Sequence, residues 1–360
     1  HSDGLLKRER TAEAHMSTDI WNDAARVGVW RNVDRQTFET EIQPQGRPAV
    51  LKGLVRDWPM TQAAAESAKA LRDLLTRAAN NKPIAYLEAP PDVAGRYGYK
   101  PDFSGFNFER RQSELTPFLD RLIATMGDPA PTSLYAGAVN VPAHAPALLS
   151  THELPLLAGV DERLVSLWIG NRGRTPAHWD LPQNIACVIT GRRRFTLFPT
   201  EQVKNLYVGP LDVTIAGQPS SLVDFHAPDF EKYPRFRDAV AAAEIAELEP
   251  GDALYMPSLW VHHVESLDSF GAMMNFWWRD GPKHLITPFF TMLHALLTVR
   301  GLPPAERDAW RVMFDHFVFE QNGDPFAHLP DEARGVFGST TPERLAQVRE
   351  RLLRTLLPRN

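Results

Sequence analysis

Cysteine is almost absent from this chain of 360 residues, which contains Cys187 and no other. No disulfide within the chain is possible, and a metal site built from several thiolates is excluded. We therefore expect a protein of a reducing compartment, the cytoplasm. The sequence also lacks an apolar run near the roughly 18 residues that a membrane-spanning helix needs, so we expect no membrane association.

An excess of positive charge is missing as well. The chain has 39 lysine and arginine residues against 44 aspartate and glutamate residues, which gives a formal net charge of −5. Because a nucleic-acid-binding protein usually presents a basic face to the phosphates, this balance argues against nucleic acid as the main partner. The first residues are polar and contain no signal-peptide core. We interpret residues 1–15 as the remnant of an expression tag and Met16 as the native start.

Short β-type segments fill the middle of the sequence. Six are expected, at residues 164–169, 185–189, 194–198, 253–256, 260–265 and 272–278. Turn signals such as Thr190-Gly191 separate them, and the one helical pattern between them is the end of a long polar insertion, at residues 237–246. Several short strands in succession predict a mainly β core of the sandwich, jelly-roll or barrel type.

Helical patterns flank this β region on both sides. On the N-terminal side, two amphipathic helices alternate with short strands; the helices are expected at residues 61–77 and 115–126, the strands at 48–55, 84–87 and 133–139. On the C-terminal side, three apolar helices are expected at 287–300, at 304–320 and from Thr341 onward. We place one domain at residues 16–282 and a helical region at residues 283–360.

His178-Trp-Asp180 and the distant His262 suggest the chemistry. A histidine, an aspartate two residues later and a second histidine on a β-strand form the ligand set of a facial triad, which holds Fe(II) and leaves one side of the ion open. Residues i and i+2 of a strand face the same side, so His178 and Asp180 can share one ion while Trp179 points away. The pair alone is weak evidence, since 12 histidines and 44 acidic residues in 360 produce about one such match by chance.

Arg193 strengthens this interpretation. Strand alternation places it on the same face as Phe195 and Leu197, and a charge on an apolar face needs a partner. A dicarboxylate ligand would supply one, because guanidinium binds a carboxylate through two parallel hydrogen bonds. A buried ion pair with a carboxylate of the protein is the alternative.

From about residue 168 to 278 the chain resembles the JmjC-type cupin family, the cupin-8 group, of Fe(II)- and 2-oxoglutarate-dependent oxygenases, and among them the asparaginyl hydroxylases. The resemblance implies a double-stranded β-helix (cupin or jelly roll) with N-terminal helices packed on it and a C-terminal helical appendage. It also implies hydroxylation of a protein or peptide side chain, an amino acid or a small metabolite with O2, and release of succinate and CO2. In layout it extends over residues 46–280.

The resemblance assigns roles to individual residues, and none of them is catalytic beyond the metal centre. His178, Asp180 and His262 match the metal ligands. The residues that match those beside 2-oxoglutarate or the metal are Tyr135, Thr175, Asn184, Arg193 and Asn275. Arg193 stands where the family most often has a lysine. Trp277 matches an aromatic residue on the substrate side, and Trp179 is a second candidate for the substrate pocket.

Alternatives remain for the function and for the partners. A cupin enzyme that uses a divalent metal without 2-oxoglutarate would fit the triad, as would a non-catalytic metal-binding module. In the family, C-terminal helices often form a dimer interface, and the apolar faces near Phe314 and Leu352 would suit a homodimer or packing on the parent chain equally. His263 and Glu265 are expected as a surface pair on the outer face, and His226 is expected to be structural or exposed.

Overall fold

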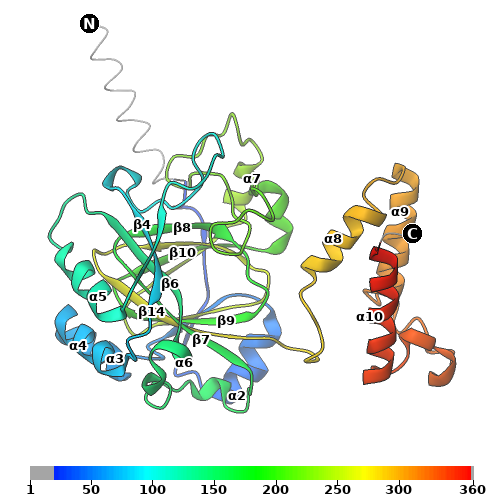
Figure 1. The fold of residues 1–360 in the computed structure, drawn as a ribbon, viewed down its shortest axis with the longest axis horizontal. Coiled ribbons are helices and arrows are strands. Elements are labelled where there is room, and N and C mark those ends of the chain that lie inside the picture. Colours follow the sequence, from blue (N-terminus) through cyan, green and yellow to red (C-terminus); the bar gives the residue numbers. More distant parts are fainter. Residues whose placement is uncertain (1–19, 358–360) are drawn as a thin grey trace, which may run out of the picture. The chain divides into compact units, whose positions relative to one another are not determined.

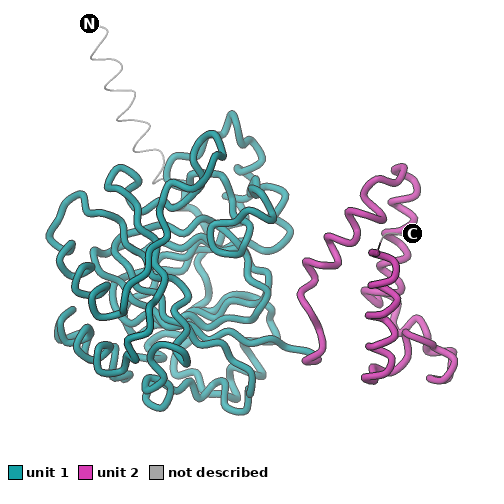
Figure 2. Tube along the Cα trace, in the orientation of Figure 1, with its two compact units in different colours: residues 1–281 teal, residues 282–360 magenta. Residues whose placement is uncertain are grey.

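The chain separates into two compact units, residues up to Gly281 and residues from Pro282 onward (Figure 2). This computed structural model describes residues 20–357. The predicted tag remnant, residues 1–15, and Met16 lie outside the described residues. Between residues 20 and 357, no helix combines the length and the apolar character that crossing a membrane requires.

Two β-sheets form the centre of unit 1 (Figure 1). The larger sheet has nine strands in the order β2 (Val29–Arg31), β3 (Ala49–Lys52), β12 (Ala253–Met256), β9 (Gln183–Thr190), β14 (Gly271–Trp278), β7 (Arg163–Gly170), β6 (Ser133–Asn140), β4 (Ile84–Ala89) and β5 (Glu109–Ser113). The smaller sheet has five strands in the order β1 (Ala25–Arg26), β11 (Glu244–Leu248), β10 (Arg193–Phe198), β13 (Val261–Ser266) and β8 (Gly173–His178).

The inner faces of the two sheets enclose an apolar core. Val188 and Met273 of the larger sheet share one buried cluster with Phe195 and Leu197 of the smaller sheet. Successive strand residues point to opposite faces, so each strand contributes every second side chain to this core. The predicted mainly β, jelly-roll type core is therefore confirmed.

Helices cover the outer face of the larger sheet, as expected. They are α3 (Pro59–Glu66), α4 (Ala68–Ala78) and α5 (Leu115–Ala124), with shorter turns at α2 (Arg35–Thr37) and α6 (Val141–His144). Leu75 of α4 and Phe118 of α5 lie in the buried cluster on this face. The single helix expected at residues 61–77 is wrong, because Ser67 is extended and its side chain caps α4 by accepting a hydrogen bond from the Ala70 N–H at 3.0 Å.

The insertion between β10 and β11 covers the outer face of the smaller sheet. Leu206, Val223 and Phe236 of this segment pack in one buried cluster with Val261 of β13. The helix expected at residues 237–246 is shorter, since α7 spans Phe236–Ala241 and Glu244 already begins β11. Pairing of β11 with β10 overrides the helical propensity of this alanine-rich stretch.

Unit 2 consists of three helices with little buried surface. They are α8 (Phe289–Thr298), α9 (Pro304–Phe317) and α10 (Pro342–Leu356), and none of them contains a buried residue. Thr341 caps α10 by accepting a hydrogen bond from the Arg344 N–H at 3.3 Å, and Pro342 occupies the first turn. Within residues 282–357, Pro325 is the one buried residue.

Candidate metal centre

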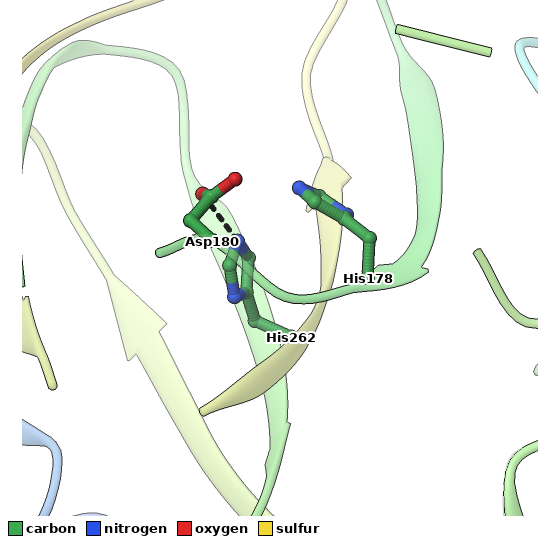
Figure 3. A group of neighbouring side chains, drawn as sticks. All are labelled: His178, Asp180 and His262. Atoms are coloured by element: carbon green, nitrogen blue, oxygen red, sulfur yellow. Dashed lines mark ion pairs between the residues drawn. The ribbon is translucent and has the colours of Figure 1, made fainter. Parts of the chain in front are cut away.

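The three predicted metal ligands come together between the two sheets. His178 ends β8, Asp180 lies two residues beyond that end, and His262 in β13 is paired with His178. One ligand atom from each side chain lies within 4.8 Å of the others, and Figure 3 shows the three side chains converging. Among the described residues this is the one group of three histidine, cysteine or acidic side chains with such a spacing. The group could hold a metal ion.

A β-bulge in β8 explains why Thr175 and His178 share the inner face. They are three positions apart in the sequence, so in a regular strand they would face opposite sides. The pairing of β8 with β13 shifts between His262 and Val264, which leaves an extra residue in β8. The bulge therefore brings the Thr175 hydroxyl to the same cavity as the metal ligands.

Both imidazole rings are oriented by the backbone. Nδ1 of His178 lies 2.8 Å from the carbonyl oxygen of Pro176, and Nδ1 of His262 lies 3.0 Å from that of Trp260. A carbonyl oxygen only accepts, so each Nδ1 carries a proton and donates it. Each Nε2 is then left with a lone pair, the form in which histidine binds a metal.

The protonation states also suit a metal ion. Burial, with the nearby His262, lowers the pKa of His178 to about 4. Burial alone would raise the pKa of Asp180, but its contact with His262 and the two neighbouring imidazoles hold that pKa below its usual value. At neutral pH the site therefore presents a neutral imidazole at His178 and a carboxylate at Asp180, and metal binding displaces no proton from either.

Arg193 places a buried positive charge beside this cluster. It begins β10, directly after the turn at Gly191, whose φ of +71° favours glycine. The residue is 3% exposed, its Nε has no hydrogen-bond partner, and no carboxylate of the described residues forms an ion pair with it. Burial lowers the pKa of Arg193, so the protein atoms around it stabilise the cation poorly.

The surroundings of Arg193 fit the carboxylate of a bound acid. Tyr135, Thr175 and Ser266 line the same small hollow as Arg193. The Ser266 hydroxyl is buried without a partner, and Tyr135 interacts with Thr175. Arg193 and these three hydroxyls can donate to a carboxylate, and 2-oxoglutarate has one at its distal end. Ser266 was not among the predicted residues, although its spacing from His262 on one strand already placed both on the same face.

Asn184 and Asn275 lie on neighbouring strands of the larger sheet and are both buried. The Asn275 amide donates to the Asn184 side-chain oxygen at 3.4 Å, and the Trp168 ring N–H donates to the Asn275 oxygen at 2.8 Å. Trp168 was not among the predicted residues. The chain of bonds fixes the orientation of both amides next to the aromatic side of the site.

A cavity of about 300 Å³ opens beside the metal ligands. Tyr135, Trp168 and Trp277 line it, and the two indole rings meet edge to face with centroids 5.8 Å apart. The Trp277 ring N–H is buried without a partner, so it is available to a ligand. Trp179 is placed differently: it packs on the outer cluster around Phe198 and is not part of this lining.

The expected surface pair of His263 and Glu265 is wrong, because both residues are buried, at 5% and 6% exposed. The insertion covers them. His226 from the insertion contacts Glu265, with Nε2 and Oε1 2.5 Å apart, and Phe225 stacks on the His263 ring with centroids 4.3 Å apart. Strand alternation correctly separates these side chains from His262 but does not predict what covers them.

A family model described as a cupin-like domain matches residues 35–284. The matched region is more than half of the chain and includes the metal cluster, Tyr135 and Arg193. It therefore covers every residue of the candidate site.

Individual relatives carry several different names. The chain is 28% identical to tRNA wybutosine-synthesizing protein 5 of Danio rerio, over 71% of this chain and 76% of that protein. It is 35% identical to lysine-specific demethylase 8 of Xenopus tropicalis, over 34% of this chain and 26% of that protein. With human HSPB1-associated protein 1 it shares 35% identity over 33% of this chain and 24% of that protein. The names of these relatives indicate different substrates and roles.

Proposed function

The chain belongs to the cupin-like domain family, and from this membership we propose that it is an Fe(II)- and 2-oxoglutarate-dependent oxygenase that hydroxylates its substrate. The observation that carries the proposal is Arg193, a buried cation that forms no ion pair with the described residues and shares a small hollow with Thr175, which also lines the cavity at His178 and Asp180. A metal site alone would fit many reactions. A metal site with an adjacent receptor for a carboxylate fits an acidic cosubstrate.

Iron bound there supplies, together with 2-oxoglutarate and O2, the conversion of a substrate C–H bond to C–OH with release of succinate and CO2. The residues of the chain bind and orient the reactants. His178, Asp180 and His262 would hold the iron, and the cavity that His178 and Asp180 line would receive the reactants. Arg193 holds the distal carboxylate, with hydroxyl donors from Thr175, Tyr135 and Ser266.

Aromatic side chains complete the site. Trp168 and Trp277 line the cavity together with His178 and Asp180 and exclude water from it. The Trp168 ring N–H donates a hydrogen bond to the side-chain oxygen of Asn275, so it fixes the Asn275 amide relative to the aromatic wall of the cavity. The substrate is a protein side chain, an amino acid or a small metabolite. The relatives named for tRNA modification and for lysine demethylation point to two different substrates, so neither name decides among these three classes.

The proposal is tested by adding Fe(II) and then 2-oxoglutarate without oxygen. Chelation of the metal by 2-oxoglutarate should produce a visible charge-transfer band, and admission of air should yield succinate. Asp180→Ala should abolish both signals. A wild-type protein that binds Fe(II) but gives neither band nor succinate would favour a cupin metalloenzyme without 2-oxoglutarate, and one that binds no metal would favour a non-catalytic module.

We also propose that unit 2 forms a homodimer. Many large apolar side chains of its helices are exposed, among them Phe290, Leu297, Val312, Leu353 and Leu356. Such a surface is rare on a monomer and common at an interface between copies. Sedimentation should show a dimer for the wild type and a monomer for Leu353→Glu, with Arg351→Glu as the charge-changing control on the same helix. A wild-type monomer at micromolar concentration would contradict the proposal.

A further inference from the structure

A second cavity, of about 310 Å³, lies on the opposite face of β13 from the metal ligands. His263 lines it from β13 and Arg174 lines it from β8, and the insertion closes it with residues 220–233. We call it the outer cavity, and the cavity beside the metal the inner cavity. Tyr97, Pro176, Ile215 and Ser220 line both, so the two adjoin along one wall.

The lining of the outer cavity has an excess of positive charge. Four cationic side chains face two carboxylates; the cations are Arg96, Lys100, Arg174 and Lys232, and the carboxylates are Asp224 and Asp229. Asp224 lies between two guanidiniums, 3.1 Å from Arg96 and 3.5 Å from Arg174. Glu265 also acts on Arg174, so three carboxylates face the four cations and one positive charge is left for a ligand.

Three buried polar atoms on this lining have no hydrogen-bond partner. They are the Tyr97 hydroxyl, the Ser220 hydroxyl and Nδ1 of His263. The three residues are 4%, 3% and 5% exposed. A buried polar atom without a partner costs free energy, and a native structure normally satisfies it with water or a ligand. His263 lines the outer cavity alone, whereas Tyr97 and Ser220 belong to the wall that the two cavities share, so a polar ligand in the outer cavity, at this wall, would satisfy these atoms.

We propose that the outer cavity binds a phosphate group of the substrate. Arg174 and Arg96 neutralise its charge, while Ser220, Tyr97 and His263 supply neutral hydrogen-bonding groups at the wall and floor. This assignment of a substrate class rests on the proposed oxygenase function, because the substrate that places its phosphate in the outer cavity would be oxidised in the inner cavity. Because the two cavities share a wall, the phosphate group of such a substrate would bind next to the part of the molecule that is oxidised.

The binding step is tested by calorimetric titration of the full chain with inorganic phosphate. Arg174→Gln removes the most buried cation and should weaken phosphate binding at least about tenfold, the effect of losing a charge-assisted hydrogen bond. Arg194→Gln is the matched control: Arg194 lies on the outer face of the same sheet, pairs with Glu247 at 2.8 Å and does not line the cavity. It should change the affinity less than about twofold.

Arg96→Gln is a second variant, useful if Arg174→Gln fails to fold, because the Arg96 side chain is 46% exposed. It should weaken binding in the same direction. Equal binding by Arg174→Gln, Arg96→Gln and Arg194→Gln would mean an adventitious ion only and would overturn the proposal, as would no binding by the wild type. Arg96 lines neither the inner cavity nor the hollow around Arg193, so Arg96→Gln should leave the charge-transfer band of Fe(II) and 2-oxoglutarate unchanged, and the two proposals fail separately.

A second experiment distinguishes a free phosphate ion from a phosphate group of the substrate. Succinate formation by the iron-loaded wild type is measured with a small-molecule extract of the cells that make the protein, before and after phosphatase treatment. Stimulation that disappears with phosphatase, and that is absent in Arg174→Gln, is expected. Stimulation that survives phosphatase, or none with either extract, would overturn the assignment to the substrate.

Discussion

Two neighbouring histidines, His262 and His263, lie on opposite faces of β13 and have different environments. His262 faces the other metal ligands, with its ring held by the Trp260 carbonyl and its Nε2 3.5 Å from Asp180. His263 faces the outer cavity and stacks on Phe225. His263-Val-Glu265 has the same sequence spacing as His178-Trp-Asp180, yet it is not part of a three-ligand group among the described residues. The two sequence pairs therefore differ in their surroundings. A third ligand, His262, lies close to His178 and Asp180, whereas His263 and Glu265 have no such third ligand among the described residues.

The largest expected effect tests this difference directly. His262→Ala should weaken Fe(II) binding by at least about 100-fold, because even residues that only orient a ligand cost 10- to 100-fold when lost. His263→Ala should leave Fe(II) affinity unchanged. Metal titration of both variants under anaerobic conditions measures the effect. The opposite result would shift the assigned register of β13 by one residue.

Arg193 provides the next largest effect, on the inner face. Arg193→Met should weaken 2-oxoglutarate binding by about 10- to 100-fold, the loss of a charge-assisted pair in a buried site. Arg193→Lys, which restores the residue common in the family, should recover most of the affinity. Titration of the iron-loaded protein by its charge-transfer band measures both variants. Unchanged affinity in Arg193→Met would remove the residue from the cosubstrate site.

Glu265, on the outer face of β13, makes the stability of the fold depend on pH. Burial alone would raise its pKa, but the hydrogen bond with His226 and the neighbouring His263 hold the pKa below the ordinary 4.5. The ionised carboxylate therefore stabilises the fold above about pH 4.5, and this contribution disappears as the pH falls through the lower, folded-state pKa. Glu265→Gln should cost about 1 kcal/mol of the free energy of unfolding at pH 7, since His226 is half exposed. Urea unfolding from pH 7 to pH 4 measures it, and a difference from wild type that grows toward acid would contradict the sign.

The smallest effect belongs to the rim of the outer face. Arg194 and Glu247 are exposed partners on neighbouring strands, with side chains 32% and 50% accessible. Arg194→Gln should change the free energy of unfolding by less than about 0.5 kcal/mol, because exposed ion pairs contribute little. Urea unfolding at pH 7 checks the value. A loss of unfolding free energy as large as that of Glu265→Gln would mean that the burial of an ion pair does not determine how much it stabilises the fold.

Strand periodicity predicted the inner face well. Alternation placed Arg193 with Phe195 and Leu197, and the structure has all three facing inward between the sheets. The spacing of His178 and Asp180 was explained by a regular strand, whereas β8 ends at His178 and contains a bulge. Bulges arise from pairing between strands, which the local sequence does not encode.

The outer face could not be predicted in the same way. Alternation shows that His263 and Glu265 lie opposite to His262, but their burial depends on the insertion, which is distant in sequence and packs across the sheet. His226 and Arg174 likewise have no local pattern that pairs them with β13. Contacts of this kind follow from tertiary packing, and the helix expected at residues 237–246 was wrong for the same reason.

The central claim is that the inner face of β13 holds the metal and the acidic cosubstrate. An anaerobic crystal structure with Fe(II) and N-oxalylglycine, the inert analogue of 2-oxoglutarate, tests it most directly. The predicted result is anomalous density bonded to His178, Asp180 and His262, with the distal carboxylate of the analogue on Arg193. Metal bound instead by His226 and Glu265 on the outer face, or an analogue that leaves Arg193 without a partner, would contradict the claim.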